Sequence, residues 1–300
     1  MRFSFTPKHN KILQQVCALL VLCTWVGLFQ ACMPPQQQEL ATPLPVSPWG
    51  GKYAYQYDIP ADMPRKQPGS VPVVIAVVNP EYREKESALD TEIYSKVGKG
   101  FSASMGTDLD KILLAKGLTT TGPFPSLDEI TYSEKKSAAL TLAPQIFLTA
   151  DVKYVDNCAE SRAKGIPCAP INNYGQFRSG REFVMVVSGW ISFVMQEPLS
   201  GEKMWIKKLE LDPVEIRGVD VFETIPMYSN VSDGCGGTRQ VLSGYAKSNN
   251  LVYDGKADAM AFAIQKMYPT ILSQFQKYLD TDEMQELKRK TAEIRAAKVY

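Results

Sequence analysis

The sequence predicts an α+β fold: a mixed, mostly antiparallel sheet with helices packed mainly on one face, forming a single domain plus a C-terminal helix. Three observations support this fold class. Residues 71–78 are short, β-branched and apolar on both faces, as in a buried central strand. Residues 87–116 repeat an apolar side chain every four positions, as in an amphipathic helix. The apolar segment 181–197 is followed by a turn and a returning strand, 203–215, which indicates an antiparallel hairpin.

Residues 1–31 have the pattern of a secretory signal peptide. Basic residues precede an apolar run over 12–29, and the small residue Ala31 stands before Cys32 and a polar, proline-rich tract. This order resembles the signal of bacterial lipoproteins, in which a lipid is attached to Cys32 after cleavage. In such proteins a residue other than Asp after the cysteine, here Met33, implies the outer membrane. The alternative is an uncleaved anchor, since the run is just long enough to span a bilayer.

Loss of the signal peptide removes three basic residues and no acidic ones, which changes the formal charge from +1 to −2. The mature chain therefore has no basic field that would attract nucleic acid. His9, the only histidine, also leaves with the signal peptide, which excludes histidine-dependent catalysis and most zinc and copper sites. No motif indicates a catalytic residue, a cofactor or a metal site, and we expect a protein that is not an enzyme.

Three cysteines remain beside Cys32, which allows one disulfide and one leftover thiol. Cys158 and Cys168 lie close together in a loop-like segment and are the candidate pair. On the chain-entropy model, closing so short a loop contributes about 2–3 kcal/mol. Whether Cys235 is free or bridged stays open.

Residues 32–52 carry the lipidated cysteine and are rich in proline and glutamine without an apolar period, which predicts an extended tether. Residues 52–59 alternate, with Tyr53, Tyr55 and Tyr57 on one face of an expected strand. The three rings are interpreted as the buried half of a sheet, with a sugar-stacking platform as the alternative.

The helix expected at 87–116 contains Gly98, Gly100 and Gly106, each of which weakens it by up to about 1 kcal/mol and is compatible with close packing. A phosphate loop is excluded, because no lysine followed by Ser or Thr closes the glycine pattern.

Strands are expected at 117–123 and 140–154. Between them, 126–139 is expected to form a short polar helix, opened by Ser126 and Glu129 at capping-box spacing.

Trp190 and Trp205 belong to the expected hairpin, where buried packing is the default and a ligand platform the alternative. The polar residues of 219–250 suggest a long surface loop. Residues 257–279 follow with a helical apolar stripe. These segments place the α+β domain at 53–280 and a charged helical tail at 281–300. The tail is interpreted as a solvated end-helix, and the alternative is a helix that docks on a partner.

Several segments occur in an order typical of a known family. They are VVIAVVNPEYREK, DKILLAKGL, SEKKSAA, QIFLTADV, VMQEPLSGEKM and KADAMAFAIQKMYPTILSQFQKYLD. Over residues 53–297 the chain resembles the neuraminyllactose-binding haemagglutinin (HpaA-type) lipoproteins. The family's proposed sialic-acid motif is a run of basic residues after the strand matching 145–154. Here that place holds only Arg162 and Lys164, so the resemblance supplies no binding residue.

The resemblance implies an outer-membrane lipoprotein associated with adhesion to sialylated glycans or with envelope assemblies. Two functions follow as hypotheses. The first is a non-enzymatic interaction or structural subunit that contacts other envelope proteins, for example of secretion or flagellar machinery. The second is a surface adhesin that binds sialylated host glycans. Both place the protein at a membrane through the lipid on Cys32, with the periplasmic or surface face undecided.

Overall fold

The computed structural model describes residues 44–50, 52–84, 91–155, 178–232 and 238–298. The chain divides into two units, 1–41 and 42–300, and every described residue belongs to the second. Four cysteines lie outside the described residues. They are Cys32 of the predicted lipid site, Cys158 and Cys168 of the predicted disulfide, and Cys235. Lipid attachment and the disulfide therefore stay predictions.

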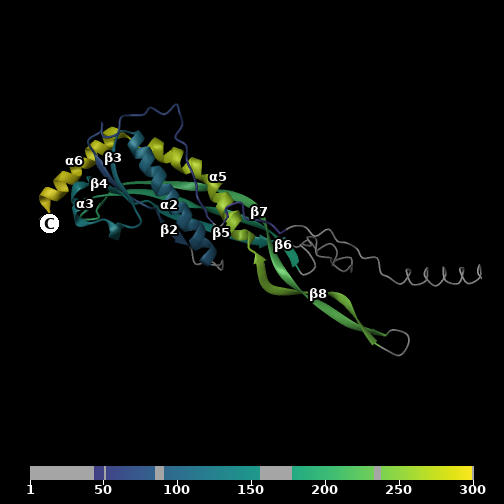
Figure 1. Ribbon diagram of the computed structural model, residues 1–300. Coiled ribbons are helices and arrows are strands. Elements are labelled where there is room, and N and C mark those ends of the chain that lie inside the picture. Colours follow the sequence, from purple (N-terminus) through teal and green to yellow (C-terminus); the bar gives the residue numbers. More distant parts are fainter. Residues whose placement is uncertain (1–43, 51, 85–90, 156–177, 233–237, 299–300) are drawn as a thin grey trace, which may run out of the picture. The chain divides into compact units, whose positions relative to one another are not determined.

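The described residues form one eight-stranded sheet in the order β2-β5-β6-β4-β1-β3, with β7 paired to β6 and β8 paired to β7 (Figure 1). β1 runs parallel to β3 and β4, and β2 runs parallel to β5. The long pairings among β5, β6, β7 and β8 are antiparallel. The strands are β1 Val74–Val78, β2 Glu81–Glu84, β3 Thr119–Phe124, β4 Leu140–Leu142, β5 Gln145–Tyr154, β6 Arg178–Gln196, β7 Lys203–Ser232 and β8 Thr238–Tyr253.

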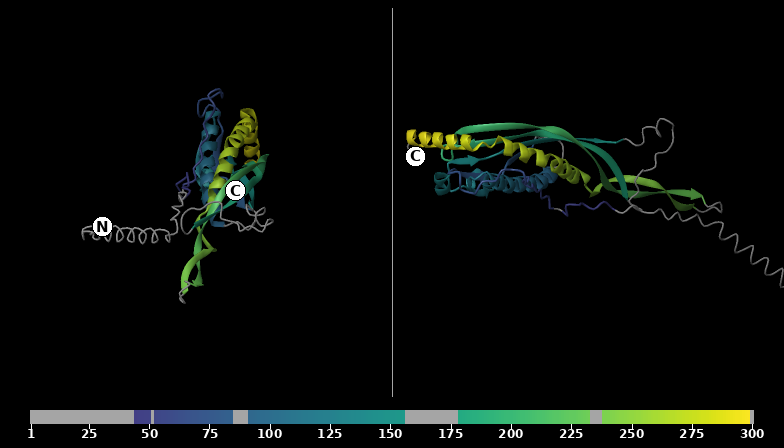
Figure 2. Two further views of the ribbon diagram at one scale, coloured as in Figure 1. Left: turned by 90° about the vertical axis from the view of Figure 1, so that its right-hand side faces the viewer. Right: turned by 90° about the horizontal axis from the view of Figure 1, so that it is seen from above.

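Helices α2 (Thr91–Ala115) and α5 (Gly255–Tyr278) lie side by side on one face of this sheet (Figure 2). A smaller apolar cluster on the other side of β1 contains residues from the segment around α3 (Tyr132–Ser137). Helix α6 (Thr281–Ala297) follows α5 directly. The fold is therefore α+β, with a mixed, mostly antiparallel sheet and helices mainly on one face, as the sequence predicts.

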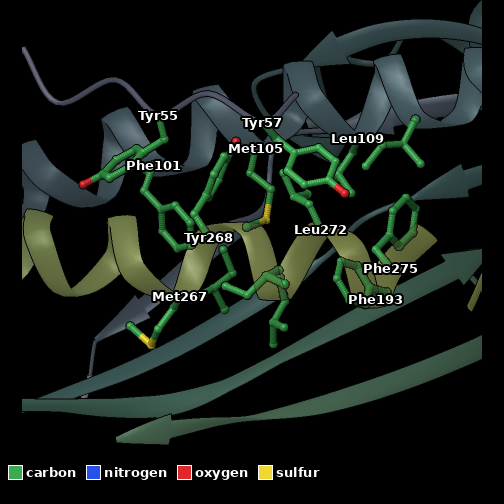
Figure 3. Close-up of a cluster of buried hydrophobic side chains, with 14 of the residues drawn as sticks. Tyr55, Tyr57, Phe101, Met105, Leu109, Phe193, Met267, Tyr268, Leu272 and Phe275 are labelled. Carbon is green, nitrogen blue, oxygen red and sulfur yellow. The ribbon is translucent and has the colours of Figure 1, made fainter. Parts of the chain in front are cut away.

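The apolar stripes of the two long helices form the core between the helices and the sheet (Figure 3). In α2 the buried positions recur every four residues, as expected from the sequence. In α5 the stripe continues through Pro269, which lies inside the helix. Rings pack against one another across the layers, with the centroids of Phe193 and Phe275 4.6 Å apart. The buried stripe residues of α2 and α5 are Val97, Phe101, Met105, Leu109, Leu113, Met260, Ile264, Met267, Ile271 and Phe275.

The tyrosine segment at 52–59 is not a strand, contrary to the sequence prediction. Its backbone extends along α2, where the amides of Tyr55 and Tyr57 donate to Ser104 Oγ (2.9 Å) and Asp108 Oδ2 (3.0 Å). These side chains take the place of a neighbouring strand as hydrogen-bond acceptors. The alternation still identifies the buried face, because Tyr55 and Tyr57 are buried in the core. The alternative interpretation from the sequence is a platform of exposed rings that stack on sugars. It does not fit Tyr55 and Tyr57, because both rings are buried.

Close packing explains two of the glycines within α2. A Cβ at Gly100 would lie 1.9 Å from the carbonyl oxygen of Tyr53, and a Cβ at Gly106 would lie 1.9 Å from Asn79 Oδ1. The absence of a side chain therefore lets the tyrosine segment and the residues after β1 approach the helix.

Gly100→Ala tests this packing. Alanine favours a helix by about 1 kcal/mol over glycine, but overpacking against a backbone carbonyl costs about 1–3 kcal/mol. We expect a net loss of stability in urea denaturation, while Lys99→Ala, an exposed neighbour in the same helix, stays near wild type. A Gly100→Ala variant more stable than wild type would show that the tyrosine segment does not contact α2 at Gly100.

Three further expectations differ from the structure. The short helix begins at Tyr132, because Thr131 and Glu134 form the capping box, whereas Ser126 makes no side-chain cap and precedes only the 3-10 turn η1 (Leu127–Glu129). The strand expected at 140–154 is two strands, β4 and β5, separated at Ala143-Pro144. The prediction of a long loop at 219–250 is wrong, because most of these residues lie in β7 and β8.

Candidate interaction surface

The ends of β7 and β8 form a two-stranded ribbon, residues 224–232 and 238–247, here called the hairpin arm. Glu223 is the last residue of β7 that pairs with β6 in the described part of the chain, and beyond it β7 pairs with β8. The arm extends away from α2 and α5 (Figure 1). An isolated two-stranded ribbon is marginally stable in water, so an arm of this kind is expected to gain stability from a neighbour.

Both faces of the hairpin arm carry exposed apolar side chains. Side chains alternate along a strand and cross-strand partners share a face, so the pairing register assigns each residue to a face. Ile225 and Met227 lie on one face with Val241, and Tyr228 lies on the other with Leu242. Ile225 is 57% exposed and Tyr228 59%. Exposed apolar residues gathered in one element, rather than scattered singly, are typical of an interaction site.

The charges and backbone of the arm restrict how it makes contact. By sequence, residues 224–247 contain two basic residues, Arg239 and Lys247, and one acidic residue, Asp233. Pro226 provides no N–H, and the β7–β8 register shifts between Met227 and Tyr228. Proline and bulges protect sheet edges against pairing with further strands. The apolar faces, rather than the edges, are therefore the surface available for contact.

The root of the arm is fixed to the domain by two buried carboxylates. Asp258, in the first turn of α5, accepts hydrogen bonds from the hydroxyls of Tyr253 (2.6 Å) and Ser47 (2.7 Å). Asp220 accepts from the Gly255 amide (2.9 Å) and from the hydroxyl of Tyr154 (2.7 Å). The end of β8, the start of α5 and the N-terminal segment of the domain therefore meet at one place.

The tyrosines at this root are held in their neutral form. Burial, together with the nearby Asp258 carboxylate, raises the pKa of Tyr53 to about 12. Burial and the hydrogen bond to Asp258 also raise the pKa of Tyr253. Neutral phenols donate to the carboxylate at physiological pH, which suits a structural joint and supplies no nucleophile.

A second exposed group lies on the sheet face turned away from the core. Phe147 and Trp190 are cross-strand partners, and their rings stack with centroids 5.7 Å apart at 19°. The Lys208 ammonium lies 4.9 Å from the Trp190 ring centroid. Both rings are partly exposed, whereas Trp205 is only 5% exposed and belongs to the core, as its default interpretation predicts.

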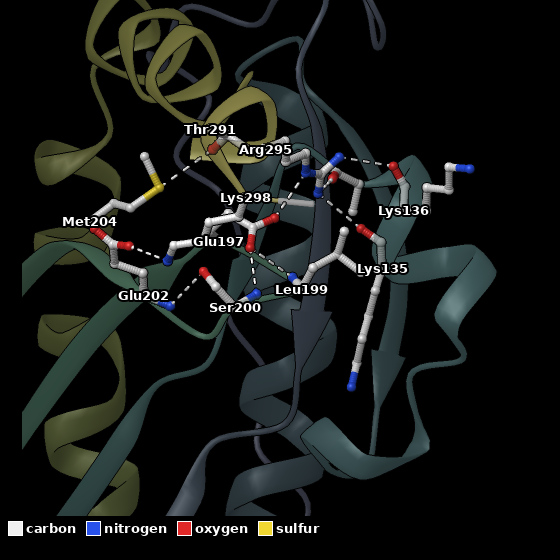
Figure 4. Close-up of polar contacts among 11 residues, drawn as sticks. Lys135, Lys136, Glu197, Leu199, Ser200, Glu202, Met204, Thr291, Arg295 and Lys298 are labelled. Carbon is white, nitrogen blue, oxygen red and sulfur yellow. Dashed lines mark hydrogen bonds and ion pairs between the residues drawn. The ribbon is translucent and has the colours of Figure 1, made fainter. Parts of the chain in front are cut away.

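The turn between β6 and β7 contains EPLSGE, the most distinctive of the family-like segments (Figure 4). The carboxylate of Glu197, fully buried, accepts from the amides of Leu199 (3.0 Å) and Ser200 and from Arg295 Nε (2.9 Å). Gly201 adopts a φ of +70°, which the turn requires. The glutamate therefore stabilises the turn and binds it to α6.

Arg295 connects α6 to the segment before β4. Its guanidinium donates to the carbonyl oxygens of Lys135 (3.1 Å), Lys136 (3.0 Å) and Ala138 (2.9 Å) as well as to Glu197. Together with the buried residues Met284, Leu287 and Thr291, this network packs α6 against the domain while its charged face stays exposed. Sequence reasoning missed this role, because an arginine in a charged helix carries no local signal of its partner.

Among the described residues no three His, Cys, Asp or Glu side chains are placed to hold a metal ion. In the same part of the chain no helix is both long and apolar enough to cross a membrane. The polar clusters that are present join elements of the fold through Asp108, Glu197, Asp220 and Asp258. The exposed apolar side chains of the hairpin arm make it the most prominent candidate for function.

Comparison with known proteins gives structural likenesses only. No family model matches the chain, and no curated protein matches it. Among solved structures, one matches over 78% of this chain and 97% of its own, at a TM-score of 0.47 and 14% identity. It is a neuraminyllactose-binding haemagglutinin homologue from Helicobacter pylori. The name of this structure is that of the family which the sequence segments resemble.

A hypothetical protein from Chlamydia trachomatis is also similar, at a TM-score of 0.22 and 11% identity over 69% of this chain and 96% of that one. At these identities neither likeness transfers a ligand or a residue role.

Proposed function

We propose that the protein is a non-enzymatic lipoprotein of the bacterial outer membrane, held by a lipid on Cys32, that works as an interaction or structural subunit of a cell-envelope assembly. The observation that carries this proposal is the hairpin arm, whose two faces present apolar side chains to the surroundings of a well-packed domain. Secretion and flagellar machinery are the assemblies in which such a subunit is expected.

The hydrogen bonds inside the domain support a role in contacts with other envelope components. The buried carboxylates each accept hydrogen bonds from groups on different elements, which stabilises the fold. The root of the arm is anchored through Asp220 and Asp258, so a force on the arm is transmitted to α5 and the sheet. A rigid support under an apolar surface is what a docking element requires.

Photo-crosslinking in cells tests this role. A photoreactive amino acid at Tyr228, on the arm, should give adducts with a neighbouring envelope component, whether protein or lipid. The matched control is Tyr132, which is 61% exposed on α3 compared with 59% for Tyr228. The proposal fails if Tyr228 gives no more adducts than Tyr132, or if the protein is recovered only as an uncrosslinked monomer from both variants.

A surface adhesin for sialylated glycans is the second candidate, favoured by the stacked pair Phe147 and Trp190 with the nearby ammonium of Lys208. Aromatic faces stack on sugars, and an ammonium pairs with the sialic carboxylate. On this account Trp190→Ala and Lys208→Ala abolish binding to sialyllactose beads, while Ile206→Ala, exposed on the neighbouring strand, does not. Equal retention of all three variants, or protection of the protein from protease on intact cells, would remove this candidate.

A further inference from the structure

We infer that the hairpin arm binds the lipid interface of the bilayer, as a second membrane contact beside the lipid on Cys32. The inference rests on the proposed function, because it takes the arm as the contact surface and Cys32 as the lipidated residue. It goes further in naming the occupant of the arm as phospholipid. Three observations carry it: the place where the tether joins the domain, the two apolar faces of the arm, and its charge.

The tether enters the domain at the root of the arm. The Ser47 hydroxyl donates to the same Asp258 carboxylate that accepts from Tyr253, the last residue of β8. Trp49 packs against Phe262 in the second turn of α5, with ring centroids 5.8 Å apart. A lipid on Cys32 therefore holds the arm end of the domain, rather than an arbitrary end, near the membrane.

The lengths of the two segments are compatible with simultaneous contact. Residues 32–47, fully extended, reach at most about 50 Å. Residues 224–232 of the arm, at about 3.3 Å per residue, span about 30 Å. The arm can therefore reach the bilayer surface while the tether is well short of full extension.

The distribution of apolar residues favours lipid over a protein partner. A protein surface covers one face of a ribbon, but here Met227 and Val241 are exposed on one face and Tyr228 and Leu242 on the other. A fluid lipid interface surrounds both faces at once. Tyrosine is enriched at the membrane–water interface, where its ring is in an apolar layer and its hydroxyl is hydrated.

Charge and hydrogen bonding set the depth of the contact. By sequence, residues 224–247 contain Arg239, Lys247 and Asp233, a formal charge of +1, which is compatible with anionic headgroups. The open edges of a two-stranded ribbon need water or headgroups as partners, because unsatisfied backbone groups are excluded from the hydrocarbon core. The arm is therefore expected at the headgroup boundary and not across the bilayer.

A single added tryptophan reports the position of the arm in the full, lipidated protein. Tyr228→Trp and the control Tyr132→Trp are reconstituted into vesicles of phosphatidylethanolamine and phosphatidylglycerol, with and without brominated acyl chains. Relative to wild type, the emission added at position 228 should shift to the blue and be quenched by the brominated lipid. The emission added at position 132 should do neither.

A charge reversal of the surface supplies the second readout. Met227→Glu together with Val241→Glu, in the Tyr228→Trp protein, should remove the quenching, whereas Ile206→Glu, exposed on the sheet, should leave it unchanged. Sedimentation with the vesicles reports the lipid anchor separately. Protein that sediments without quenching at position 228 overturns the lipid contact and leaves the proposed function standing, above all if position 228 crosslinks to a protein. Failure to sediment at all contradicts the lipid anchor and with it both proposals.

Discussion

Replacement of Arg295 by alanine should destabilise the domain by about 3–5 kcal/mol, the typical cost of leaving one member of a buried ion pair without its partner. The Glu197 side chain is fully buried, and that of Arg295 is 25% exposed. Without the guanidinium, the buried carboxylate loses its ion-pair partner, and three carbonyl oxygens lose this donor. The loss should appear as a lower urea midpoint with an unchanged slope.

Lys298→Ala is the matched control for this experiment. Lys298 also lies at the end of α6 and pairs with the same turn, through Glu202 at 2.9 Å, but both side chains are about half exposed. Exposed pairs typically contribute about 0–1 kcal/mol. If Arg295→Ala were as mild as Lys298→Ala, the buried network would not be what holds α6 to the turn.

The ion pair between Glu197 and Arg295 also predicts that the stability of the domain depends on pH. Burial acts to raise the pKa of Glu197, but the donors from Ser200, Arg295 and Leu199 outweigh it and hold the pKa below its ordinary value. A carboxyl with a lowered pKa in the folded state contributes stability above its unfolded pKa, about 4.3, and this contribution is lost as the pH falls through the folded pKa. The free energy of unfolding should therefore decline below about pH 4 in wild type, and less steeply in Glu197→Gln.

Asp108→Ala should produce the second large loss. This carboxylate, 2% exposed, accepts from the hydroxyl of Tyr268 (2.7 Å), the amide of Tyr57 (3.0 Å) and the ammonium of Lys111 (2.7 Å). Lys111 is half exposed and can turn to water, but the other two donors are buried. Each buried donor left without a partner costs about 1–3 kcal/mol.

Tyr268→Phe separates the hydrogen bonds from the packing around Asp108. It removes one donor and keeps the ring, so the expected loss is smaller, about 1 kcal/mol. Both variants are compared by chemical denaturation, with the near-ultraviolet circular dichroism as a report on the aromatic core. An Asp108→Ala variant no less stable than Tyr268→Phe would mean that the tyrosine segment is held by its rings alone.

The elements with a strong period could be predicted from the sequence. The stripes of α2 and α5 and the β-branched run of β1 identify their buried faces directly, because side-chain burial follows the period of each element. The Tyr55 and Tyr57 alternation also identified buried positions but suggested the wrong element. An extended chain has the period of a strand whether its amides meet a neighbouring strand or, as here, Ser104 and Asp108.

The hairpin arm could not be predicted, because both of its faces mix polar and apolar residues. A strand with one buried face alternates clearly, but none of the described side chains of 224–232 and 238–247 is buried, and the serine, asparagine and glycine there favour loops. The hydrogen-bond partners of Glu197 and Asp258 could not be predicted from the sequence either. Arg295 and Ser47 are distant in sequence, and only the fold brings them to these carboxylates.

The most direct test of the account is the fate of a Cys32→Ser variant in cells fed a labelled fatty acid. The wild-type protein should incorporate the label, lose residues 1–31 and sediment with the outer membrane. The variant should stay unlabelled and should retain its signal peptide. A Cys32→Ser protein that matures normally and sediments with membranes like wild type would contradict the lipid anchor on which the proposed function depends.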